Sequence, residues 1–355
     1  MASRVERLRE LFAPEDVEGL VVSKPENRAY LSGFTGSAGI LLITERDAFL
    51  VTDFRYEEQA AAQAPDFKVV KHGAQMMESL KELLDSAGVR RIGFERDFVT
   101  FGTYEQYRDK LAPVELVPVD GVTEKLRLKK DASEIETIRK AVAIGDEAFN
   151  HILKFIEPGQ REEDIALELE FAMRKAGAQG RSFDIIVASG PRSSLPHGVA
   201  SDRVVQDGEF IEMDFGCVYR GYCSDMTRTV VLGEPDEKQR EIYEIVLEAQ
   251  LAALDAARPG ITGTELDAVA RKIIADRGYG ENFGHGLGHG VGRVIHEGPR
   301  VSLQGDQILE PGMVVTIEPG IYIPGWGGVR IEDMVVITET GREVLTGSPK
   351  ELIVL

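Results

Sequence analysis

The chain has 355 residues, enough for about two domains, and its 43% hydrophobic and 28% charged residues are typical of a globular protein. Such a composition argues against long disorder or a low-complexity chain. Sixty acidic residues against 41 basic ones give a net charge of −19, which disfavours nucleic acid as a partner. No apolar run approaches the roughly 18 residues of a membrane span, and the charged start lacks the apolar stretch of a signal peptide. We therefore expect a cytoplasmic protein with no membrane partner.

The first part of the chain alternates short apolar runs with helical patterns, as α/β units do. The predicted strands are residues 19–23, 39–44, 48–53, 67–72, 91–95 and 114–119, and the predicted helices are residues 4–12, 76–87 and 103–111. The charged stretch 124–136 then changes the character of the chain, so we place a domain boundary near residue 127. Ser133 is expected to cap a long helix that runs to about Phe155, with Glu136 completing a capping box.

The second part, residues 128–355, contains an internal repeat. A segment that begins at Pro158 has a counterpart that begins 101 residues later at Pro259. Each copy follows a long helical stretch, predicted at 133–156 and at 236–257. Each copy also precedes a pair of β-like segments, predicted at 209–219 and 222–233 in the first half and at 313–323 and 328–338 in the second half. Such self-similarity predicts two related halves, with coincidence as the alternative.

Two carboxylates occupy equivalent places in each half. Asp214 matches Glu318 and Asp225 matches Glu332, at offsets of 104 and 107 residues. Duplicated halves that pack about a pseudo-twofold axis would bring all four together. Each acid taken alone is more typical of an exposed strand edge, but acids inside apolar strand patterns are rarely buried unless they are paired or bind metal. The repeat therefore favours a metal site.

The six histidines are unevenly placed. His197 stands in "SLPHGVAS", whereas His285, His289 and His296 stand in "GHGLGHGVGRVIHE". The spacing of the first two in the second segment matches the zinc-protease helix motif, but no Glu follows His285 and the interleaved glycines disfavour a helix. The glycines instead predict closely packed backbone around a site. A histidine satisfied in the core or at the surface is the alternative for each of them.

These motifs resemble those of the metallopeptidase superfamily that contains methionine aminopeptidase, aminopeptidase P and prolidase, which has the pita-bread fold. The resemblance covers residue 128 to the C-terminus, and residues 1–127 resemble the creatinase-type α/β domain of the aminopeptidase P and prolidase branch. It implies an α+β protein in which two divalent ions are held by five residues. The implied ligands are Asp214 in "MDFG", Asp225 in "CSDMTRT", His289 in "GHGLGHG", Glu318 in "IEPGIY" and Glu332 in "VRIED". Their oxygen-rich chemistry favours Mn²⁺, with Co²⁺, Fe²⁺ or Zn²⁺ as alternatives.

The resemblance also implies roles for further residues. Glu318 would move a proton to the leaving nitrogen, and His197 and His296 would steady the tetrahedral intermediate by hydrogen bonds. His285 would be an additional active-site histidine. Arg330 would orient the carboxylates, with an exposed strand charge as the alternative. Arg300 would pair with the free carboxylate of a dipeptide, with a surface arginine as the alternative.

The implied reaction is hydrolysis of the bond between an N-terminal residue and proline, by an Xaa-Pro dipeptidase (prolidase). The first alternative is an aminopeptidase P that acts on longer peptides. More remote alternatives are a metal-independent creatinase-like amidinohydrolase and a non-catalytic binding module. A homodimer is expected from the resemblance, with residues 52–56 as a candidate contact or a simple turn. The two cysteines, Cys217 and Cys223, are too few for a disulfide scaffold and lack zinc-site spacing, so we expect free thiols.

Overall fold

The computed structural model describes residues 3–355 and divides into two compact units, Met1–Arg127 and Leu128–Leu355. No helix of the described chain is long and apolar enough to span a bilayer. Both cysteines are buried and neither forms a disulfide, as expected.

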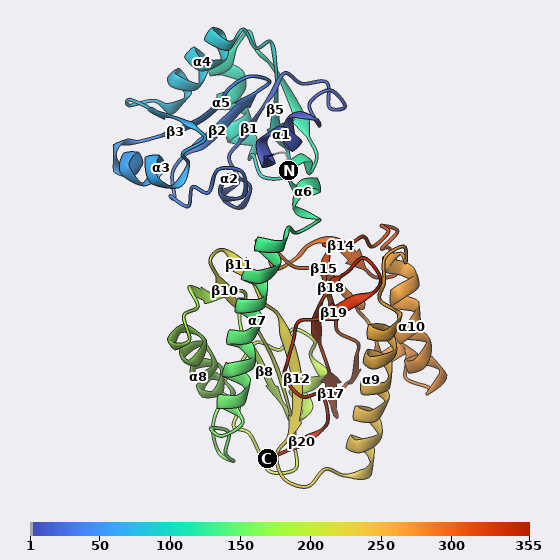
Figure 1. The fold of residues 1–355 in the computed structure, drawn as a ribbon. Coiled ribbons are helices and arrows are strands. Elements are labelled where there is room, and N and C mark those ends of the chain that lie inside the picture. Colours follow the sequence, from blue (N-terminus) through green and yellow to red (C-terminus); the bar gives the residue numbers. More distant parts are fainter. Residues whose placement is uncertain (1–2) are drawn as a thin grey trace. The chain divides into compact units, whose positions relative to one another are not determined.

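The first unit is built around one mixed six-stranded sheet in the order β4-β3-β2-β1-β5-β6 (Figure 1). Strand β1 pairs antiparallel with β2 and parallel with β5. All six predicted strands and all three predicted helices of this unit are confirmed. Its elements are α1 (Arg4–Arg9), β1 (Gly19–Val22), α2 (Pro25–Ser32), β2 (Ile40–Thr44), β3 (Ala48–Thr52), η1 (Phe54–Tyr56), α3 (Glu57–Gln63), β4 (Lys68–Lys71), α4 (Met76–Ala87), β5 (Arg91–Glu95), α5 (Phe101–Leu111), β6 (Glu115–Val119) and α6 (Val122–Arg127).

Helices that pack on both faces of the sheet explain why the sequences of β1 and β2 are continuous apolar runs. Every residue of these two central strands is buried, because helices cover both faces of the sheet. Residues 52–56 form the end of β3 and the short turn η1, where Asp53 accepts the backbone N–H of Arg55. The Phe54 side chain is 76% exposed, and its expected contact with a partner subunit stays a prediction.

The second unit contains the remaining helices and several small sheets. Its elements are α7 (Ala132–Ile152), α8 (Glu162–Lys175), β7 (Gly180–Arg181), β8 (Ile186–Ser189), η2 (Gly190–Ser194), β9 (Phe210–Phe215), β10 (Cys217–Tyr219), β11 (Tyr222–Cys223), β12 (Met226–Val231), α9 (Glu237–Ala256), α10 (Gly263–Asp276), η3 (Gly280–Asn282), β13 (Gly288–Gly290), β14 (Glu297–Val301), β15 (Val314–Ile317), β16 (Gly320–Ile323), β17 (Gly327–Arg330), β18 (Asp333–Ile337), β19 (Arg342–Val344) and β20 (Ile353–Val354).

The repeat predicted from the sequence appears as two matching layers. Helices α7 and α8 pack on the sheet β20-β12-β9-β8, and helices α9 and α10 pack on the sheet β14-β13-β15-β18-β19. Figure 1 shows the two helix pairs on opposite sides of the strands. Helix α10 spans the residues that lie 101 positions after those of α8, so the offset seen in the sequence holds residue by residue.

The predicted cap of α7 is wrong. Asp131, not Ser133, is the N-cap residue, and its carboxylate accepts the backbone N–H groups of Ser133 and Glu134. Glu134 returns the capping-box bond to the backbone N–H of Asp131, so Glu136 has no part in the cap. The aspartate prevails because its carboxylate reaches two amides of the first turn at once.

Each long β-like segment of the second unit breaks into two short strands. The first breaks at Gly216, where a Cβ atom would lie 1.8 Å from the carbonyl oxygen of Ser224. The third breaks between β15 and β16, around Pro319, which has no backbone N–H to continue a ladder. These breaks lie beside Asp214 and Glu318, so the acids stand where the strands end and a cavity begins.

Candidate active site

All ten residues singled out in the sequence line one cavity of about 460 Å³ in the second unit. They come from both halves of the repeat and from the segments between the helices and strands. The ten are Asp214, Asp225, His289, Glu318, Glu332, His197, His285, His296, Arg300 and Arg330.

The strands place the four acids in equivalent positions. Asp214 lies in β9 directly opposite Thr227 of β12, and Asp225 immediately precedes β12. In the other half, Glu318 follows directly after β15 and Glu332 immediately precedes β18. Each half therefore offers one acid at the end of its first strand and one acid just before its second strand.

The imidazole of His289 faces these carboxylates. Its Nε2 lies 3.5 Å from Oδ2 of Asp225 and 3.4 Å from Oε1 of Glu318. Its Nδ1 lies 3.1 Å from the carbonyl oxygen of Gly290, a partner that can only accept, so the proton belongs on Nδ1. Nε2 then presents a lone pair to the carboxylate cluster. Ligand atoms of Asp225, His289 and Glu332 all lie within 4.8 Å of one another.

Glycines allow the strand of His289 to approach its neighbours closely. A Cβ atom on Gly288 would lie 2.1 Å from the carbonyl oxygen of Thr316, and one on Gly290 would lie 1.9 Å from that of Gly298. Thr316 also accepts the backbone N–H of His289 and donates its hydroxyl to Glu318, both at 3.0 Å. The predicted close packing of the backbone around His289 is thus confirmed. Thr316, which bonds to both His289 and Glu318, holds these two residues relative to each other.

Burial makes this cluster unfavourable for bare negative charge. It raises the pKa values of Asp225 and Glu332 well above the ordinary carboxyl range and that of Glu318 to about 7, with repulsion among the carboxylates adding to the effect. Two buried oxygens, Oδ1 of Asp214 and Oε1 of Glu332, have no hydrogen-bond partner among residues 3–355. Oxygens of this kind next to an imidazole lone pair fit divalent cations, which would offset the repulsion.

Arg330 lies behind the carboxylates, fully buried, and connects them. Its guanidinium donates to Asp214 at 2.7 Å and to the hydroxyl of Thr227 at 2.9 Å. Thr227 in turn donates to Oε2 of Glu332 at 2.6 Å. The arginine also pairs with Glu212 at 2.8 Å and donates to the phenol oxygen of Tyr322 at 2.7 Å. The alternative interpretation of Arg330, an exposed charge on a strand, is therefore wrong, because the residue is buried.

The sequence analysis assigned no role to three residues of this network: Glu212, Thr227 and Tyr322. One signal for Glu212 does exist in the sequence, since it stands two residues before Asp214 in a strand and so shares its face. Burial raises the pKa of Glu212 to about 7, although the neighbouring guanidinium of Arg330 acts in the opposite direction.

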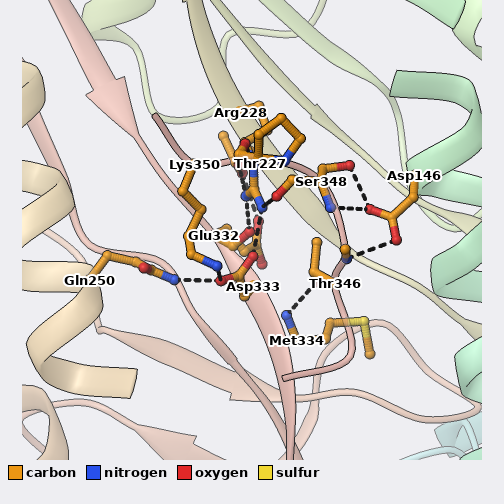
Figure 2. A network of polar contacts seen from close by, with 12 residues as sticks. Asp146, Thr227, Arg228, Gln250, Glu332, Asp333, Met334, Thr346, Ser348 and Lys350 are labelled. Carbon is orange, nitrogen blue, oxygen red and sulfur yellow. Dashed lines mark hydrogen bonds and ion pairs between the residues drawn. The ribbon is translucent and has the colours of Figure 1, made fainter. Parts of the chain in front are cut away.

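A second buried network fixes the backbone next to Glu332 (Figure 2). Arg228 donates to Oδ1 of Asp333 at 2.7 Å and also to the backbone carbonyl of Glu332. The other carboxylate oxygen of Asp333 accepts from Gln250 at 2.8 Å and pairs with Lys350 at 2.9 Å. This network ties the start of β18 to β12, to α9 and to the C-terminal segment, and so limits how far Glu332 can move.

The remaining histidines differ in their surroundings. His285 is half-buried, with Nδ1 2.7 Å from the carbonyl of Gly286 and Nε2 2.9 Å from the hydroxyl of Tyr322. Burial, together with Arg330, lowers the pKa of His285 to about 4, so its imidazole is neutral and both of its nitrogens are engaged. His296 and His197 are exposed on the cavity wall, and the ring of His296 meets that of His289 edge-on with centroids 4.4 Å apart.

Arg300 lies on β14 opposite His289 and is exposed at the cavity. Within residues 3–355 its guanidinium has no ion pair or hydrogen bond. The cavity therefore combines a buried acidic cluster with one uncompensated positive charge.

Comparison with known proteins finds a matching protein family for each unit. Residues 136–339 match the family described as metallopeptidase family M24, and residues 4–129 match the creatinase/prolidase N-terminal domain. A protein of Pyrococcus furiosus named Xaa-Pro dipeptidase is 42% identical over 353 residues, which covers 99% of this chain and 100% of that protein.

Solved structures give the same result for the fold. The structure titled Xaa-Pro dipeptidase from Bacillus anthracis is 49% identical, with a TM-score of 0.98 over 99% of each chain. The structure titled X-Pro aminopeptidase from Thermotoga maritima is 42% identical, with a TM-score of 0.94 over 99% of this chain and 100% of the other. The expected architecture, a creatinase-type domain followed by a pita-bread domain, is confirmed.

Proposed function

The chain belongs to metallopeptidase family M24, and from this premise we propose that it hydrolyses the bond between an N-terminal residue and proline, with Xaa-Pro dipeptides as its main substrates. The observation that carries the proposal is a buried cluster of carboxylates and one imidazole that opens on a cavity. Two of its carboxylate oxygens have no hydrogen-bond partner in the described part of the chain, residues 3–355. Relatives named for this activity support the substrate class.

Five residues would hold two divalent ions: Asp214, Asp225, His289, Glu318 and Glu332. Four carboxylates and one imidazole favour Mn²⁺, with Co²⁺, Fe²⁺ or Zn²⁺ as alternatives. When bound there, divalent ions would supply Lewis-acid chemistry that polarises the scissile carbonyl and lowers the pKa of the attacking water.

The side chains around the cluster would complete the reaction. Glu318 accepts the proton of the attacking water and returns it to the leaving nitrogen. In an Xaa-Pro bond this nitrogen belongs to a tertiary amide and carries no hydrogen. His197 and His296 lie on the cavity wall, where their ring N–H groups donate to the oxygen that becomes negative in the transition state. His285 acts as a further site histidine that orients Tyr322 and, through it, Arg330.

Arg300 supports the preference for dipeptides. A dipeptide carries its free carboxylate one residue beyond the scissile bond, and the uncompensated guanidinium of Arg300 lines the cavity and can bind it through two hydrogen bonds. A longer peptide has a neutral amide at that place. The Thermotoga maritima relative, named for aminopeptidase activity, keeps aminopeptidase P as the second candidate.

A peptide panel on the metal-reconstituted protein tests the proposal. We expect fastest hydrolysis of Xaa-Pro dipeptides, slower hydrolysis of Xaa-Pro-Yaa tripeptides, and none of creatine or of peptides without proline at the second position. A preference for the tripeptides would favour aminopeptidase P. Inactivity toward every Xaa-Pro peptide would refute the proposal. We also propose a homodimer, on the resemblance alone, which sedimentation analysis tests directly.

A further inference from the structure

His197 is held in place by its loop rather than by its own side chain. Its ring makes no hydrogen bond within residues 3–355, and the residue is exposed on the cavity wall. The loop extends from the end of β8 through η2 to Arg203. Whatever fixes this loop therefore fixes where the imidazole points.

A single buried carboxylate joins the two ends of the loop. Glu162, the first residue of α8, is completely inaccessible to solvent. Its Oε1 accepts the backbone N–H and the hydroxyl of Ser189, both at 2.8 Å, where the loop begins. Its Oε2 accepts the backbone N–H of Ser201 at 3.1 Å and its hydroxyl at 2.7 Å, where the loop returns.

Four further contacts strengthen this arrangement. Arg192, within the loop, pairs with the same Oε2 of Glu162 and donates to the carbonyl oxygen of Val199 at 2.9 Å. The first-turn amides of α8 donate to the carbonyl oxygens of Ser201 and Arg203, both at 3.0 Å. A buried charge is favourable only when it is paired and hydrogen-bonded, so these donors and the carboxylate hold one another in one geometry.

We propose that Glu162 is a positioning residue for His197. The carboxylate closes the loop at its base and so sets the place of the imidazole at the cavity, without touching the substrate. Through His197 this inference rests on the proposed peptidase function, but the closure of the loop can be measured without any substrate.

The second half of the repeat offers a matched control. Asp267 is a completely buried acid on α10, the helix that repeats α8. It accepts the backbone N–H of Leu287 at 2.9 Å and pairs with Arg271 at 2.7 Å. Arg271 donates to the carbonyl oxygens of Phe283 and His285. Asp267 thus anchors the segment of His285, not the loop of His197.

Amide hydrogen exchange by mass spectrometry tests the anchoring. Glu162→Gln should speed exchange in peptides covering 189–203 by about tenfold or more and leave 283–287 unchanged. Asp267→Asn should do the reverse. If Glu162→Gln leaves 189–203 as protected as in the parent protein, or loosens both segments equally, the inference is wrong. Ser201→Ala, which keeps the carboxylate and its other donors, should loosen the same segment to a smaller degree.

Kinetics on an Xaa-Pro dipeptide tests the connection to His197. Glu162→Gln should lower kcat by about ten- to a hundredfold, as small misplacements of a catalytic group do, with KM changed by less than about threefold. In a His197→Ala background the same substitution should change kcat by less than about twofold. An equal loss in both backgrounds would mean that Glu162 acts on the fold in general. If the parent protein cleaves no Xaa-Pro peptide, the proposed function fails, and the exchange experiment still decides whether Glu162 closes the loop.

Discussion

Replacing Thr227 with valine should weaken metal binding although it removes none of the carboxylates. The Thr227 hydroxyl donates to Glu332 at 2.6 Å and accepts from Arg330 at 2.9 Å, and valine keeps its size but makes neither bond. Hydrogen bonds to charged groups contribute about 1.5–3 kcal/mol each, so losing both should lower the free energy of unfolding of Thr227→Val by about 3–6 kcal/mol. Loss of a partner that orients a ligand typically weakens metal affinity about 10- to 100-fold.

Thr229 provides the control on the same strand. It is equally buried, but its hydroxyl donates to the backbone carbonyl of Arg330 at 3.0 Å and accepts the N–H of that residue at 3.2 Å, so within residues 3–355 its side chain forms no hydrogen bond with a proposed ligand. Thr229→Val should cost about 1–2 kcal/mol of stability and leave metal affinity within about twofold. Calorimetric titration of the metal-free proteins with Mn²⁺, together with urea unfolding, measures both quantities. Equal losses of affinity in the two variants would refute the role assigned to Thr227.

Three further predictions concern the same cavity. Glu318→Gln should reduce turnover by at least about 10²–10⁴-fold at saturating metal while circular dichroism stays unchanged, and a variant that keeps a large share of the rate would place the proton acceptor elsewhere. Arg300→Ala should raise KM for Xaa-Pro dipeptides by about tenfold and change Xaa-Pro-Yaa hydrolysis much less, because only the dipeptide presents a carboxylate there; equal effects on both would remove the support for a dipeptidase. In the metal-free protein, burial raises the pKa of Glu318 from 4.5 to about 7 and also raises the pKa values of Asp225 and Glu332. Between pH 4.5 and about 7 the folded state therefore binds more protons than the unfolded state, and the protein loses stability as the pH rises through this range. Bound cations keep the carboxylates ionised, so the difference in Tm between metal-loaded and metal-free protein should widen from pH 5 to pH 8; a constant difference would contradict the assigned electrostatics.

Periodicity and repetition in the sequence were enough to predict the strands of the first unit and the pairing of the acids in the second, but not the short strands β7, β8, β13, β14, β19 and β20. Strand β2 reads as a continuous apolar run because both of its faces are buried, and the acids Asp225 and Glu332 recur because each precedes the second strand of its half. Helices α2 and α3 have no such signal, since the sequences PENRAYLS and EEQAAAQ show no regular apolar period.

The network around Arg330 could not be derived in the same way. Its partners Thr227 and Tyr322 are ordinary strand residues whose hydroxyls gain their role only when β12, β16 and β17 come together. Likewise, the cap of α7 depended on whether an aspartate or a nearby serine reaches more amides, and Asp131 reaches two. Contacts between distant residues follow from tertiary packing, which local pattern does not specify.

Metal content and Xaa-Pro hydrolysis measured on the same sample, during stepwise addition of Mn²⁺ to the exhaustively chelated protein, test the central claim most directly. We predict negligible hydrolysis of an Xaa-Pro dipeptide without metal and activity that rises to a plateau at two ions per chain. Full activity in a preparation verified to be free of metal would contradict the account.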